Sequence, residues 1–254
     1  IFFDHIGPAQ FPPGKGVNVR SHPHIGLATI TYLFAGTMLH RDSLGCVQAI
    51  RPGEVNWMTA GRGIVHSEKV TEEVLENGQY LHGLQTWVAL PQEHEETEPR
   101  FEHYSSDAIP SVKRDGAAIR VVIGEAYGAS SPVRTESETL YVEIKLDAGA
   151  TLELPATEEL GIFVVDGDVS IGGTRLPSGG LTVLRRAAVA MVSAVSQAHV
   201  MVCGGAALEG ERIVWWNFVS SSRDRIEQAK RDWREKRFPG VPGEEDFIPL
   251  PEKR

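Results

Sequence analysis

The stretch RSHPHIGLATITYLFAG, residues 20–36, places His22 and His24 on either side of Pro23, directly before a run of β-branched and aromatic residues. Pro23 favours an extended backbone at His22, and in an extended chain residues i and i+2 point to the same face. Proline is tolerated at the start of a strand. The two imidazoles are therefore predicted to share one face at the entrance of a strand over residues 25–34, where they can form half of a metal site.

A second pair of the same kind lies further along the chain, in TAGRGIVHSE. Here His66 and Glu68 are again at positions i and i+2, and Gly61 and Gly63 before them suit a tight turn. Three imidazoles and one carboxylate suit a divalent first-row metal, and iron(II) in particular if open positions remain for other ligands. The sequence therefore predicts one divalent metal site, which two separate strands build together.

Composition excludes several classes of protein. The chain has 254 residues, of which 41% are hydrophobic and 23% charged, as in an ordinary folded protein. The formal net charge of −9 argues against nucleic-acid binding, which needs clustered basic residues. Only Cys46 and Cys203 are present, so we expect neither a disulfide framework nor a cysteine zinc site. No apolar run is long enough to span a membrane, and a cytoplasmic location is expected, or a nuclear one in a eukaryote.

Many short apolar runs, separated by Gly, Pro and Asp, predict an all-β protein. Residues 92–115 are polar and acidic and indicate a connecting stretch. Strand–turn–strand patterns around Gly36 and around Gly167 resemble each other. Two tandem β-barrels of one design would explain this repeat, although any two hairpins could produce it as well.

One helix is predicted near the C-terminus, over residues 222–238 of SSSRDRIEQAKRDWREKRFPG. Ser221 with Asp224 resembles a capping box, and Pro239 ends the pattern. Basic residues in this segment alternate with acidic ones, which favours a solvated face over a nucleic-acid surface. The apolar stripe that should face the protein consists of Ile226, Ala229 and Trp233.

Several of these segments resemble the pirin family of the cupin superfamily. The resemblance rests on FFDHIGPAQFPP, HPHIGLATITYLFAG, HRDSLG, RPGEVNWMTAGRGIVHSE and LQTWVALP, and it is dense over residues 1–91. It implies two stacked cupin β-barrels in one chain, with one iron in the N-terminal barrel. By position, the metal ligands of the family fall on His22, His24, His66 and Glu68, the four residues that alternation also selects.

The resemblance implies two domains. We expect an N-terminal metal-binding cupin barrel over residues 1–115, which includes the connecting stretch, and a C-terminal metal-free barrel over 116–254, which includes the helix and an extended tail. The second half lacks paired histidines, and its single histidine, His199, is isolated. A monomer is expected, because two barrels in one chain already provide the packing that single cupins obtain by dimerising.

Relatives of this kind include flavonol dioxygenases, so the leading hypothesis is an iron-dependent dioxygenase of the quercetin 2,3-dioxygenase type. A flavonol-like substrate would bind the metal as its 3-oxyanion and react with O2, with ring cleavage and release of carbon monoxide. Glu68 would be both a metal ligand and the catalytic base that accepts the substrate proton.

Two alternatives remain open at this stage. One is a non-enzymatic metal-binding regulatory protein that acts through protein partners, as a transcriptional co-regulator or a modulator of metabolic enzymes. The other is a zinc-binding or metal-free barrel without activity. The turn LHRDSLG also has two interpretations: His40, Arg41 and Asp42 either line the pocket or form a charged hairpin end.

Overall fold

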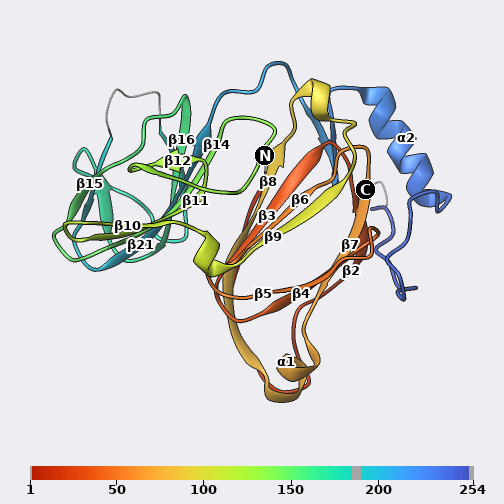
Figure 1. The fold of residues 1–254 in the computed structure, drawn as a ribbon, viewed down its shortest axis with the longest axis horizontal. Coiled ribbons are helices and arrows are strands. Elements are labelled where there is room, and N and C mark those ends of the chain that lie inside the picture. Colours follow the sequence, from red (N-terminus) through yellow and green to blue (C-terminus); the bar gives the residue numbers. More distant parts are fainter. Residues whose placement is uncertain (1, 185–189, 252–254) are drawn as a thin grey trace. The chain divides into compact units, whose positions relative to one another are not determined.

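The structure is a computed structural model that describes residues 2–184 and 190–251. Strands dominate it and a helix lies near the C-terminus (Figure 1), which confirms the all-β prediction. The chain forms two compact units. The first unit consists of Ile1–Ser106 together with Leu208–Arg254, and the second unit is Asp107–Ala207. Each unit is built from two facing antiparallel sheets.

The larger sheet of the first unit has the strand order β1-β8-β3-β6-β9. Its strands are β1 (Phe2–Phe11), β8 (Gln79–Ala89), β3 (Leu27–Ala35), β6 (Val55–Thr59) and β9 (Arg100–Tyr104). The smaller sheet has the order β2-β7-β4-β5. Its strands are β2 (Asn18–His24), β7 (Ile64–Lys69), β4 (Met38–Asp42) and β5 (Val47–Ile50). Buried side chains from both sheets share one core cluster, formed by Leu33, Leu81, Met38 and Ile50.

His22 and His24 are at the end of one strand rather than at the start of the next. They are the last inward residues of β2, and the chain turns at Gly26 before β3 begins at Leu27. Gly26 has φ +66°, and a Cβ there would lie 2.0 Å from the carbonyl oxygen of Val219. Only glycine fits this turn, so the predicted strand over 25–34 is divided from the histidines.

The second unit repeats the two-sheet design. Its larger sheet has the order β10-β11-β14-β21-β16-β19 and its smaller sheet the order β15-β20-β17-β18. The larger sheet contains β10 (Ser111–Arg114), β11 (Ala117–Ile123), β14 (Thr139–Leu146), β21 (Ala198–Gly205), β16 (Glu159–Asp166) and β19 (Leu181–Leu184). The smaller contains β15 (Thr151–Glu153), β20 (Met191–Ala194), β17 (Val169–Ile171) and β18 (Thr174–Arg175). A short hairpin joins β12 (Glu125–Ala126) to β13 (Ala129–Ser130). Apolar residues of both sheets form the core of the second unit, among them Ile162, Val202, Leu152 and Val192.

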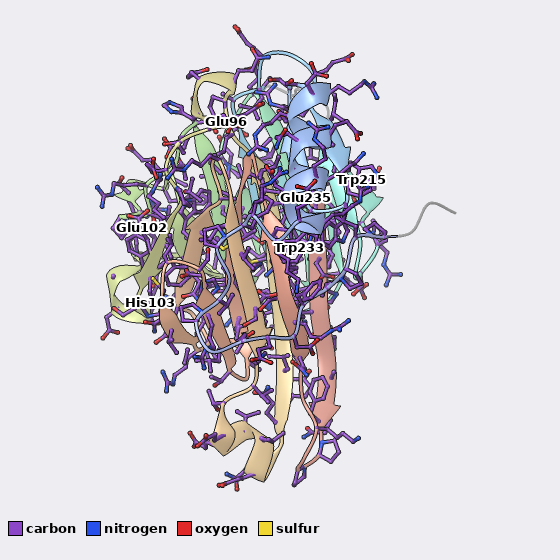
Figure 2. The ribbon with its side chains drawn as sticks, turned by 90° about the vertical axis from the view of Figure 1, so that its right-hand side faces the viewer. Glu96, Glu102, His103, Trp215, Trp233 and Glu235 are labelled. Carbon is purple, nitrogen blue, oxygen red and sulfur yellow. The ribbon has the colours of Figure 1, made fainter. Side chains whose placement is uncertain are left out.

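The structure groups the C-terminal segment with the first unit, whereas the sequence placed it with the second barrel. The reason is the apolar face of helix α2 (Arg223–Arg234). Its predicted stripe is buried, and it packs in one cluster with Ile25 and Val65 of the first unit. Two further strands of this segment, β22 (Ile213–Trp215) and β23 (Phe218–Ser220), form a hairpin. Figure 2 looks onto this face and labels Trp233 of α2 and, beside the helix, Trp215 of β22.

The helix boundaries differ from the predicted 222–238. The N-cap is Ser222, whose hydroxyl accepts the main-chain N–H of Arg225, and not Ser221. The N–H and hydroxyl of Ser221 instead bind Glu95. A short helix α1 (Glu72–Asn77) and the 3-10 turns Gln92–His94 and Ser106–Ala108 complete the fold. Among the described residues, no helix combines the length and apolarity needed to cross a membrane.

Glu95 attaches the C-terminal segment to the N-terminal part of the first unit. Replacing Glu95 should therefore destabilise the whole first unit. The Glu95 carboxylate lies 2.7 Å from the Arg212 guanidinium, and the two side chains are only 5% and 6% exposed. E95A leaves Arg212 buried without its charge partner, and we expect a loss of about 3–5 kcal/mol in the free energy of unfolding. The control E96A removes an exposed contact with Arg225 and should cost under about 1 kcal/mol.

Urea titration followed by tryptophan fluorescence measures this loss. All five tryptophans are in the segments that form the first unit, so the signal reports that unit alone. Equal stabilities of the two variants would contradict the role given to Glu95.

Candidate metal centre

Three histidines converge inside the first unit. His22 on β2 pairs directly with His66 on β7 in the antiparallel ladder, and His24 follows two residues after His22 on the same face. One nitrogen of each ring lies within 4.8 Å of the others, and all three side chains are buried. The structure therefore brings together the three imidazoles that alternation selected.

The spacing of the nitrogens matches the ligands of a single ion. Nε2 of His24 lies 3.1 Å from Nε2 of His66. Two adjacent ligands with bonds of about 2.1 Å at a right angle are separated by about 3 Å. Nδ1 of His22 donates to the carbonyl oxygen of Arg20 at 2.9 Å, which leaves Nε2 with its lone pair free. The donor set therefore fits a divalent metal ion.

Burial keeps the three rings neutral, which is the form that binds metals. Desolvation lowers the pKa of His22 to about 4, although its hydrogen bond to Arg20 acts in the opposite direction. Desolvation and the neighbouring imidazoles hold the pKa values of His24 and His66 well below the ordinary value. A pair of charged rings at this spacing would repel, so neutrality is also what allows the cluster to pack.

Glu68 lies on β7 two residues after His66 and is also buried. Its carboxylate accepts a hydrogen bond from Nε2 of Gln85 on β8, in the facing sheet. Among the described residues, the close group of donors consists of the three imidazoles without Glu68. Burial raises the pKa of Glu68, and the electrostatic interaction with His40 and the hydrogen bond from Gln85 offset this only in part.

Gln85 and His82 lie on opposite faces of β8, as their spacing requires. Gln85 faces Glu68, whereas His82 pairs with His5 on β1 through an Nε2–Nε2 contact of 2.8 Å. Alternation along a strand allows at most one of these two side chains to face the cavity, but it does not say which one. The choice depends on the register of β8 against β3, in which Gln85 lies opposite Thr31.

His40 and Asp42 belong to the site as well. The fully buried Asp42 accepts from Nε2 of His40 at 2.9 Å and caps the turn through the N–H groups of Leu44 and Cys46. Nδ1 of His40 is 3.4 Å from Nδ1 of His66. This order of contacts favours the His66 tautomer with a proton on Nδ1 and a lone pair on Nε2.

The residues of this turn divide between the two interpretations, because His40 lines the cluster and Asp42 closes the hairpin, whereas Arg41 lies 3.6 Å from Glu244. The i, i+2 alternation of His40 and Asp42 is the same signal that identified the other two pairs. A plane-parallel stack of His40 on Phe101, at 4.2 Å between ring centroids, fixes its orientation.

Comparison with known proteins identifies the family. The Pirin model matches residues 1–88, and the model of the pirin C-terminal cupin domain matches residues 141–239. A pirin-like protein of Caulobacter vibrioides is 46% identical over 99% of this chain and 88% of its own length. The chain belongs to the pirin family. This confirms the two cupin barrels expected from the resemblance.

Two further proteins are similar to this pirin, one in sequence and one in structure. Human pirin is 33% identical over 89% of this chain and 79% of its own length. The crystal structure named as quercetin 2,3-dioxygenase from Acinetobacter baumannii superposes with a TM-score of 0.92 at 34% identity. That match covers 100% of this chain and 85% of the other.

The lowered imidazole pKa values predict that the metal-free pirin loses stability in mild acid. An unfolded histidine takes up a proton near pH 6.5, whereas His22, His24 and His66 stay neutral in the fold. From pH 7 to pH 5 the unfolded state therefore gains more protons, and the free energy of unfolding falls. The decline is at most about 4 kcal/mol per pH unit, and the raised pKa of Glu68 acts against it.

Urea titrations at pH 7, 6 and 5 measure this decline through tryptophan fluorescence. Replacing one member, as in H66Q, should reduce the slope by roughly a third, since each imidazole contributes one proton. A stability that is flat over this range would show that the buried rings do not resist protonation.

Proposed function

We propose that this pirin is an iron-dependent dioxygenase of the quercetin 2,3-dioxygenase type, which opens a flavonol-like substrate with O2. The observation that carries the proposal is the buried group of three neutral imidazoles next to a carboxylate whose pKa is raised. The similarity to the Acinetobacter baumannii quercetin 2,3-dioxygenase supports the same chemistry.

Each residue has a stated role in this proposal. His22, His24 and His66 hold a single divalent ion, and Glu68 completes the set as a fourth ligand. When bound, iron(II) supplies a Lewis acid that orients an oxyanion and exchanges electrons with dioxygen. His40 and Asp42 fix the tautomer of His66.

Glu68 is the proposed base for the 3-hydroxyl proton of the flavonol. Its raised pKa is closer to neutral pH than that of an exposed carboxyl, which makes it a better proton acceptor. Gln85 donates a hydrogen bond to one carboxylate oxygen and thereby orients the other. The side chains around the cluster are buried, so the proton passes to Glu68 rather than to bulk water.

The metal assignment predicts about one ion per chain in the wild-type protein, because within residues 2–184 and 190–251 the three imidazoles are the one close group of donors found. In the second barrel His199 lies 2.9 Å from Glu143, whose carboxylate also lies 3.5 Å from Nζ of Lys145. H66A should lose most of the metal, whereas H94A, in the turn after β8, should keep it. Elemental analysis after anaerobic loading with Fe²⁺ checks this, and unchanged metal content in H66A would refute the assignment.

The catalytic assignment predicts that E68Q loses turnover far more severely than metal. A glutamine oxygen can still coordinate, but it cannot take the substrate proton, so the rate should fall about 100-fold or more. The matched control E98Q changes an exposed glutamate paired with Arg62 and should remain active.

Oxygen consumption and the bleaching of quercetin absorbance measure the rate. If the iron-loaded wild type shows neither, the dioxygenase proposal fails and the regulatory alternative takes its place.

A further inference from the structure

The ladder between β2 and β7 contains an irregularity next to the metal ligands. Val19 pairs with Glu68 and His22 pairs with His66, so Arg20 and Ser21 together face the single residue Ser67. Such a β-bulge breaks the local pairing and re-aims the side chains that follow it. Without the extra residue, the next side chain after the bulge would point to the other face, and His22 would leave the cluster.

Both carbonyl groups of the bulge have partners outside the ladder. The carbonyl of Arg20 accepts from Nδ1 of His22 itself. The carbonyl of Ser21 accepts the main-chain N–H of Ile248 at 2.9 Å, and Ser21 forms a parallel bridge with Phe247. The bulge is thus completed by the C-terminal tail, residues 239–251, which is more than two hundred residues away in sequence.

Glu244 of the tail joins β2 to β7 on the face opposite the histidines. Its Oε2 accepts from the hydroxyl of Ser21, and its Oε1 accepts from the hydroxyl of Ser67, both at 2.9 Å. Lys69 adds an ion pair at 3.0 Å, and the Glu244 side chain is only 5% exposed. Ser21 precedes His22 and Ser67 follows His66, so one carboxylate connects the two strands at the ligand pair.

Other contacts hold the tail in place independently of Glu244. Val241 is buried in the cluster that contains α2. The indole N–H of Trp233 donates to the carbonyl of Ile248 at 2.9 Å, and Figure 2 shows Trp233 on the face where the tail runs. The tail therefore has a defined position from which Glu244 and Ile248 reach the bulge.

We propose that residues 244–248 of the tail are positioning residues of the metal centre, because they hold the bulge in the conformation that points His22 towards His66. The inference rests on the proposed binding of a metal by these histidines but not on any reaction. Loss of groups that orient metal ligands commonly lowers metal affinity 10–100-fold. Because coupling between two sites is reciprocal, metal binding should also hold the tail more firmly.

The first test compares two neighbouring glutamates. E244A removes the contacts with Ser21, Ser67, Lys69 and Arg41, whereas E245A changes the exposed residue next to it. Competition between the protein and a chelator for Co²⁺ measures the affinity, and the visible spectrum of bound Co²⁺ reports its coordination. We expect E244A to bind about 10-fold more weakly with an altered spectrum, and E245A to behave as the wild type.

A second variant covers the case in which E244A does not fold. S67A removes one hydroxyl and keeps the tail, so it should fold and lose less affinity than E244A. Hydrogen exchange gives an independent measurement, because the Ile248 amide is bonded to the bulge itself. Its exchange should slow when the wild type binds Co²⁺.

The outcomes separate this proposal from the proposed function. Equal Co²⁺ affinities of S67A, E245A and the wild type, or exchange at Ile248 that ignores the metal, would overturn the role of the tail alone. A wild type that binds no Co²⁺ would overturn the metal assignment together with it. An inactive protein that binds Co²⁺ and shows the expected differences would refute only the dioxygenase proposal.

Discussion

The antiparallel pairing of β2 with β7 is the interaction on which the rest of the site depends. It sets His22 against His66, and the alternation of side chains then sends His24 to the same inner face. The same alternation sends Ser21 and Ser67 to the outer face, where they meet Glu244. One hydrogen-bonded ladder therefore supplies the donors on one side and the attachment of the tail on the other.

Burial determines the chemistry of the side chains that this ladder brings together. Desolvation disfavours every charged form, so it keeps the imidazoles neutral and makes the Glu68 carboxylate a stronger base. The polar contacts are correspondingly specific. Gln85 donates a hydrogen bond to Glu68, and His40 connects Asp42 to His66. Burial of this kind disfavours any charge that has no partner of opposite sign.

The first unit is made of two segments that are separated in the chain by the whole second unit. Its integrity therefore depends on contacts between distant residues, and the buried ion pair of Glu95 and Arg212 is one of them. The helix and the tail belong to the same set of contacts. The C-terminal segment is consequently part of the unit that holds the three-histidine cluster, although none of the three imidazoles comes from it.

The sequence by itself determined the all-β class, the apolar face of α2 and three of the candidate ligands, because each of these follows from local alternation or periodicity. It could not determine that Gln85 rather than His82 faces the site, that Ser222 rather than Ser221 caps α2, or that the C-terminal segment packs on the first unit. No pattern in the sequence predicts the bulge at Ser21 or its contacts with Glu244 and Ile248 either. Only the tertiary structure decided these features, because strand register and long-range hydrogen bonds are set by packing between residues that no local pattern connects.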